Sequence, residues 1–157
     1  MVKELKILGI MALITVFAVS TFAAEEKHNA KVITVNGKAE MMIAPNKSWL
    51  PVKAGMVLSE GDVLRTMAKS GILLNVDGKG QNATVDIKEN TQLLLAELLV
   101  DREKGTEKTL LDLAMGEVLI KAQKIRAEES KFEVKTPTSI VGVRGTTFAV
   151  KVEAVEE

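Results

Sequence analysis

Short apolar segments separated by turn residues recur along most of this chain, and this spacing constrains the fold more than any other feature of the sequence. Between residues 31 and 152 they follow one another about every 8 to 12 positions, and most are bounded by Gly or Pro, which is typical of strands. The sequence therefore predicts an all-β fold of many short strands. We expect these strands at residues 31–35, 38–43, 57–58, 62–66, 72–76, 83–88, 91–95, 109–113, 118–124, 131–136, 139–144 and 146–152.

The alternation of apolar and polar residues is clearest near the C-terminus, where Phe132 and Val134 share one face of a strand and Phe148 and Val150 share one face of another. A period of two places one face in a core and the other in water. Two short segments, 61–65 and 116–121, echo each other, since each begins with Gly and an acidic residue and continues as an alternating strand. Such units favour a solenoid-like arrangement or a two-layer sandwich, and the sequence leaves both open.

The stretch 93–99 has better helix than strand propensity, although an apolar run buried on both faces of a strand has the same composition. Pattern alone leaves these two alternatives open. Residues 101–108 are charged and contain a Gly, so we expect a solvated loop there. The Asp-Gly pair at 77–78 predicts a tight hairpin turn, because Gly tolerates a positive φ, and Glu128 and Glu129 predict a second turn.

Lys3 and Lys6 precede an uncharged run over residues 7–24, an arrangement typical of a secretory signal peptide. Cleavage after Ala23 would place the small residues Thr21 and Ala23 at the two recognition positions. We therefore expect residues 1–23 to be a removed signal peptide and the mature chain to be periplasmic. The alternative is an uncleaved segment that holds the chain in the inner membrane, because the 18 residues of the run are just enough to span a bilayer.

Removing 23 of the 157 residues leaves 134, which is enough for one domain with a core. We expect a polar leader at 24–30, a β domain at 31–152 and a C-terminal tail at 153–157. The same cut lowers the basic residues from 21 to 19 and the acidic residues from 21 to 20, so the mature chain is nearly neutral. Nucleic acid is therefore not an expected partner, since attraction to phosphates needs excess positive charge.

Two segments carry a family resemblance: residues 60–66, EGDVLRT, and residues 141–146, VGVRGT, which Phe148 follows. Segments 111–120 and 132–137, which lie between these two, are similar to the family's sequence at the corresponding places. The chain resembles the FecR domain family over residues 30–152, which is almost all of the expected mature chain.

The resemblance implies an all-β domain of short strands, with a strand rather than a helix at residues 91–100. It also implies an early strand pair within residues 32–43, about the Asn-Gly at 36–37. The Asp-Gly pair at 77–78 and the Asn-Thr pair at 90–91 fit the family's turn positions.

Members of the FecR family include membrane-spanning regulators that sense an outer-membrane iron transporter and control a cytoplasmic sigma factor. Such regulators carry a cytoplasmic anti-sigma segment and a further partner-binding segment, and neither has a counterpart in the sequence given. We therefore expect a stand-alone exported FecR-type domain that engages an envelope protein in signalling or assembly. Contact with the membrane is expected only through an uncleaved signal, and the sequence predicts no oligomeric state.

Arg144, Gly145 and Thr146 form a candidate recognition motif, in which Arg144 would offer a fork of donors to a carboxylate. In the competing interpretation, Gly145 permits a bulge or tight crossing while Arg144 pairs with a structural acid such as Asp62. Gly61 and Asp62 have the same two possible roles, recognition or structure. The structural role follows because an Asp at a turn usually accepts hydrogen bonds from backbone N–H groups.

An enzyme is not expected. The only His is His28 in the polar leader, the chain has no Cys, and no Ser lies in a nucleophile-elbow sequence, so the usual nucleophile and base of acyl transfer are missing. We expect no cofactor and no metal site. The alternative function is a sensor of a small ligand, an anion such as a chelated-metal carboxylate, enclosed by Arg65, Arg144 and neighbouring acids.

Overall fold

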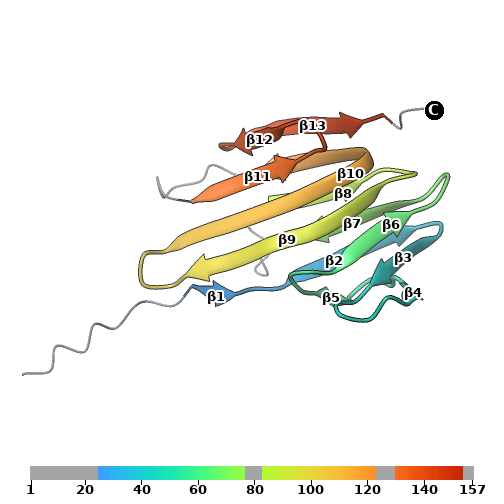
Figure 1. The fold of residues 1–157 in the computed structure, drawn as a ribbon, viewed down its shortest axis with the longest axis horizontal. Coiled ribbons are helices and arrows are strands. Elements are labelled where there is room, and N and C mark those ends of the chain that lie inside the picture. The colour runs from blue at the N-terminus through green and yellow to red at the C-terminus, as the bar shows by residue number, and fades with distance from the viewer. Residues whose placement is uncertain (1–24, 77–82, 123–129, 154–157) are drawn as a thin grey trace, which may run out of the picture.

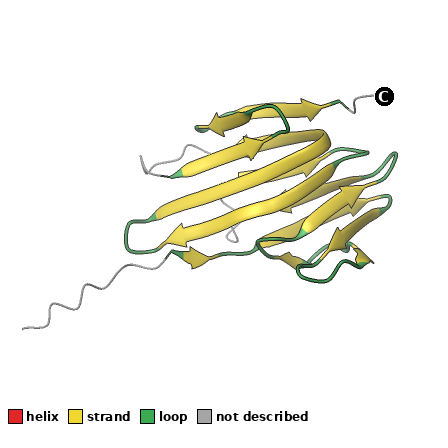
Figure 2. Cartoon of the chain, viewed as in Figure 1, coloured by secondary structure: helices red, strands yellow, loops and turns green. Residues whose placement is uncertain are grey.

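The computed structural model describes residues 25–76, 83–122 and 130–153, and within these ranges it confirms the all-β fold (Figures 1 and 2). Every regular element in this part of the chain is a strand, and none of its residues belongs to a helix that could cross a membrane. The strands are β1 (Glu26–Lys27), β2 (Ala30–Asn36), β3 (Ala39–Met42), β4 (Trp49–Pro51), β5 (Val57–Leu58), β6 (Val63–Thr66), β7 (Gly71–Asn75), β8 (Ala83–Ile87), β9 (Gln92–Asp101), β10 (Thr106–Ala122), β11 (Lys131–Lys135), β12 (Ile140–Val143) and β13 (Thr147–Val152).

The 13 described strands form one continuous curled sheet, and its two halves, called the first and second layers, share the long strand β10 (Figure 1). The first layer runs in the order β4-β3-β6-β9-β10-β11-β12, with β1 paired to the far end of β9. The second layer runs in the order β5-β2-β7-β8-β10-β13. The fold is therefore all-β, a single sheet curled into a half-barrel around its core.

Strand β10 passes from one layer to the other at Gly116. Its first part, up to Met115, pairs with β9, whereas Val118 to Ala122 pair with β8. Gly116 has a φ of +93°, a conformation that residues with a Cβ rarely adopt, so the strand bends there without ending. This bend explains why the sequence pattern predicts two strands, 109–113 and 118–124, where the structure has one.

The core lies between the two layers and is built by the inward-facing side chains of both. Leu64, Leu93 and Leu111 come from the first layer, and Leu74 and Ile120 come from the second, all with less than 2% of their surface exposed. Burying one such side chain stabilises the fold by about 1.5 to 3 kcal/mol. The apolar side chains on one side of each strand therefore determine which face of the sheet turns inward.

Residues 32–43 do not form the strand pair that the family resemblance implies. β2 pairs with β5 and β7 in the second layer, whereas β3 pairs with β4 and β6 in the first layer. The chain crosses between the layers at Gly37, whose φ is +72° and whose Cβ, if present, would lie 3.0 Å from the carbonyl oxygen of Lys69. The Asn-Gly turn at 36–37 is therefore a crossing between layers and not a hairpin.

Residues 93–99 lie in a strand, as the resemblance implies and against their local helix propensity. β9 extends to Asp101 and β10 begins at Thr106, so the charged loop is shorter than the expected 101–108. Asp101 closes this turn, because its Oδ1 accepts hydrogen bonds from the backbone N–H groups of Glu103 and Lys104, both at 3.0 Å.

Part of the polar leader is ordered against the first layer. β1 pairs with β9, and the N–H of His28 donates to the carbonyl of Leu98 at 3.0 Å. The pattern analysis missed β1 and β4, which have only two and three residues. The expected signal peptide at 1–23, the turns at 77–78 and 128–129, and residues 154–157 of the expected tail lie outside the described residues.

Candidate functional site

Asp62 is buried at the turn before β6, where it binds backbone groups. Its Oδ2 accepts a hydrogen bond from the N–H of Ser59 at 2.8 Å, and its Oδ1 accepts one from the N–H of Ala44 at 3.4 Å. Gly61 beside it has a φ of +92°. Both residues therefore build the turn, which is the structural one of the two roles considered for them.

Arg65 lies on the outward face of β6 between two partners on the same face. Its Nε donates to the Oε2 of Glu40 on β3 at 2.7 Å, and its Cζ lies 3.8 Å from the centroid of the Trp49 ring on β4. An arginine over an indole face gains a cation–π interaction in addition to its ion pair. The charge of Arg65 is thus compensated within the domain.

Arg144, Gly145 and Thr146 form the bend that connects β12 to β13, and so they join the outermost strands of the two layers. Gly145 has a φ of +65°, which agrees with the expectation that this position needs a Gly. Thr146 accepts, through its carbonyl oxygen, a hydrogen bond from the N–H of Ala122 at 3.3 Å. The side chain of Arg144 is exposed.

The structure does not bring Arg144 next to Asp62 or Arg65. β6, which carries Arg65 and follows Asp62, is separated from β12 by β9, β10 and β11 in the first layer. The suggested pair of Arg144 with Asp62 is therefore not formed, because Asp62 binds backbone N–H groups several strands away. An anion pocket enclosed by Arg65 and Arg144 together is excluded by the same separation.

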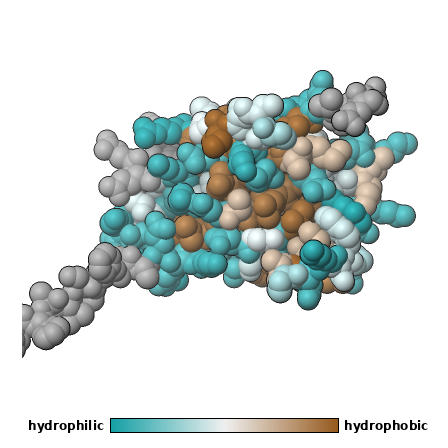
Figure 3. Space-filling view, viewed as in Figure 1, coloured by the Kyte–Doolittle hydropathy of each residue, from teal (hydrophilic) through white to brown (hydrophobic). Residues whose placement is uncertain are grey.

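The outward face of the first layer is unexpectedly apolar at its centre, which Figure 3 shows as a brown area. The strand register places Trp49, Met42, Val63 and Leu94 side by side across β4, β3, β6 and β9. All four are partly exposed. The sequence signal for this face was the unbroken apolar run at 93–95, which indicates a strand with apolar side chains on both faces.

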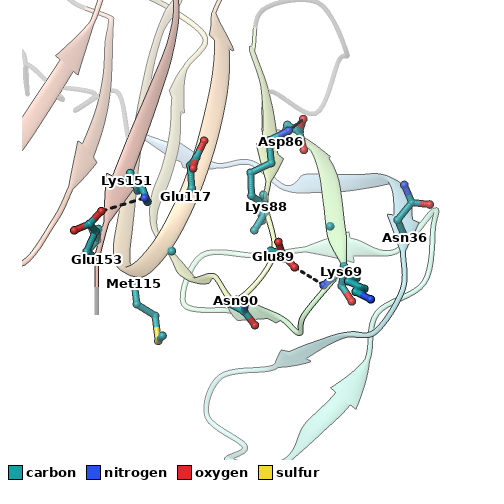
Figure 4. Close-up of a pocket in the computed structure, with 15 residues that line it drawn as sticks. Asn36, Lys69, Asp86, Lys88, Glu89, Asn90, Met115, Glu117, Lys151 and Glu153 are labelled. Carbon is teal, nitrogen blue, oxygen red and sulfur yellow. Dashed lines mark hydrogen bonds and ion pairs between the residues drawn. The ribbon is translucent and has the colours of Figure 1, made fainter. Parts of the chain in front are cut away.

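A cleft with a volume of about 940 Å³ lies at the end of the domain where β10 bends (Figure 4). Its wall contains two ion pairs, Lys88 with Asp86 at 2.6 Å and Lys151 with Glu153 at 3.1 Å. Sequence analysis did not find this cleft, because it joins segments that are far apart in the chain. Its other lining residues are Asn36, Lys69, Ser70, Gly71, Ile87, Glu89, Asn90, Met115, Gly116, Glu117 and Val152.

Two ion pairs shift the pKa of one partner on the first layer. The hydrogen bond from Lys27, 2.9 Å away, lowers the pKa of Glu60, and the N–H of Leu98 adds to this effect. The carboxylate of Glu97, 2.6 Å away, raises the pKa of Lys108. In each case the partner stabilises the charged form of the group.

These features define an all-β domain with exposed sheet edges and a cleft. The family model described as FecR protein matches residues 62–156 of the chain. This match covers more than half of the 157 residues, and the chain therefore belongs to the FecR family. Membership of this family indicates a module related to signalling and sensing. Neither the curated proteins nor the solved structures that were compared with the chain give a match.

Proposed function

We propose that this chain is a non-enzymatic binding and sensing module of the bacterial periplasm, and that it engages another envelope protein. The proposal is supported by membership of the FecR family and by the charged, then apolar, layout of residues 1–24. One observation carries it: the outermost strand of the first layer, β12, has a side to which no strand of the described sheet is hydrogen-bonded.

β12 is well suited to accept a partner strand. It lies inside the family-matched region and pairs with β11, so its position is fixed on one side. Val143 is buried in the core, whereas Ile140 keeps 63% of its surface exposed. An edge strand of this kind offers backbone N–H and C=O groups for a new ladder and side chains for specificity.

The test compares two exposed β-branched residues on edge strands at opposite ends of the sheet, Ile140 on β12 and Val57 on β5, which is 58% exposed. A lysine on an edge strand opposes strand addition. Chemical cross-linking in cells, followed by mass spectrometry of the envelope fraction, should recover one partner with the parent chain and with Val57→Lys. The same partner should be lost with Ile140→Lys.

Recovery of the partner with Ile140→Lys at the parent level would contradict binding at β12. Recovery of no envelope protein from the parent chain would contradict the proposed function itself. Both variants change exposed side chains, so their thermal midpoints should stay close to that of the parent and serve as a control for folding.

A small-ligand sensor is the second candidate, and the observation that favours it is the volume of the cleft at the bend of β10, whose lining carries three lysines and four acids. A ligand that binds only the folded state raises the thermal midpoint. Thermal unfolding of the purified chain with citrate, with ferric citrate and with buffer alone separates the two functions. A rise with either anion that Lys88→Gln reduces would support the sensor, because Lys88 lines the cleft.

A further inference from the structure

The outward face of the first layer has the composition of a contact surface rather than of a solvated sheet face. We propose that two copies of this chain associate through this face, with the apolar centres of their first layers in contact. The interface is separate from the edge of β12, so it goes beyond the proposed function and does not depend on it.

The apolar centre follows from the register of the strands. Leu64 and Leu93 point into the core, so the alternate residues Val63 and Leu94 point outward and lie opposite each other. Leu110 on β10 extends the same face, and it too is partly exposed. Monomeric proteins rarely leave a large contiguous apolar patch on a face of this kind (Figure 3).

The charges around this centre favour an identical partner. Arg65 pairs with Glu40, Lys108 pairs with Glu97 at 2.6 Å, and Lys135 pairs with Asp112 at 3.0 Å, all across neighbouring strands of this face. A strongly charged partner therefore gains no net attraction here, whereas a second copy meets no net repulsion. On the strands β3, β6, β9, β10 and β11, the outward charged residues are four acids, Glu40, Glu97, Asp112 and Glu133, and four bases, Arg65, Lys108, Lys131 and Lys135.

Among the described strands of the second layer, the register places the charged Asp86 between Leu73 and Leu119, so the outward apolar row is interrupted there. Self-association should therefore select the first layer.

The geometry of the first layer suits a two-fold contact. Two sheets pack face to face by interdigitating side chains, and a two-fold axis presents the same patch from both subunits. Trp49, held in place by Arg65 at 3.8 Å, lies at one end of the apolar row. A Trp whose position is fixed in this way is the kind of residue that dominates binding energy at interfaces.

The chain has no Cys, so a single introduced Cys reports contacts between copies without interference. Leu94→Cys places the thiol at the centre of the proposed interface, and Leu119→Cys is the matched control, because Leu119 is a partly exposed, outward Leu of the second layer. A short bis-maleimide should convert the Leu94→Cys chain, as it accumulates in cells, into a covalent dimer. The Leu119→Cys chain should not be cross-linked under the same conditions, because its thiol lies outside the proposed interface.

Light scattering of the parent chain should give twice the monomer mass, and Leu94→Glu should return it to the monomer mass with an unchanged far-UV circular dichroism spectrum. Leu119→Glu should leave the dimer intact. A monomeric parent chain would overturn the proposal. Equal cross-linking of both Cys variants, or cross-linking of Leu94→Cys to a different protein without any self-dimer, would also overturn it.

Discussion

Thr91 occupies the space that a side chain on Gly116 would need. Its Oγ1 accepts a hydrogen bond from the N–H of Glu117 at 3.0 Å and donates to the carbonyl of Glu89 at 3.0 Å. The backbone N–H of Thr91 is bound in turn by the Oγ1 of Thr66 at 3.0 Å. The turn before β9 is thus fixed directly beneath the bend of β10. Gly116 leaves room for Thr91, and Thr91 in turn binds the backbone of the bend.

Gly116→Ala should destabilise the domain strongly. A Cβ at this position would lie 2.7 Å from the carbonyl oxygen of Asn90, in addition to the cost of a φ of +93°. Together we expect a loss of about 2 to 4 kcal/mol in the free energy of unfolding, measured by chemical denaturation. Gly105→Ala is the matched control, since Gly105 has a φ of +65° but no atom within 4 Å, and it should lose only about 1 to 2 kcal/mol.

Thr91→Val keeps the shape of the side chain and removes its hydroxyl. The N–H of Glu117 then loses its acceptor at a site where Thr91 is only 1% exposed, so unfolding should become easier by about 1 to 3 kcal/mol. Thr34→Val, on the exposed part of β2, should change the denaturation midpoint little. If the two variants unfold alike, the hydroxyl of Thr91 does not support the bend.

Gly145→Val should destabilise the fold more than Arg144→Ala. Gly145 has a φ of +65°, where a β-branched residue is strained by about 1 to 3 kcal/mol, whereas the Arg144 side chain is exposed. Chemical denaturation of both variants decides the order. A Gly145→Val chain that unfolds like the parent would show that this Gly serves binding rather than the bend.

The ion pair between Glu60 and Lys27 should make the attachment of β1 depend on pH. The pKa of Glu60 is lowered in the folded state, so its contribution is present above the unfolded pKa and is lost as the pH falls through the folded pKa. At neutral pH, Glu60→Gln should lower stability by about 0.2 to 1 kcal/mol, as for other exposed pairs. Thermal midpoints recorded from pH 7 to pH 3 should converge for the two chains, and a constant difference would contradict this role.

Local pattern was sufficient for the strands whose apolar side chains alternate, and it failed where register between distant segments decides the structure. Phe132 and Val134 are buried while Lys131 and Lys135 are exposed, as their alternation predicts. In β9, by contrast, helix propensity is overridden because Leu93 and Leu95 enter the core while pairing with β10 holds the backbone extended. Propensity differences of a fraction of a kcal/mol per residue are small beside such burial.

The candidate site shows the same division. The turn role of Asp62 and the positive φ at Gly145 follow from local chemistry that the residue types reveal. The compensation of Arg65 by Glu40 and Trp49 depends on the register of three strands, which no single segment encodes. The cleft depends likewise on where β10 bends, and a pattern that predicts two strands there contains no bend.

β10 ties the stability of the two layers together. Its first part supplies a neighbour to β9 and β11, and its second part supplies a neighbour to β8 and β13. Because both layers take a neighbour from the same strand and pack against one shared core, the loss of β10 would expose core side chains of both layers at once. The domain should accordingly unfold in a single all-or-none transition, and strain applied at one end of β10 is borne by both halves of the molecule.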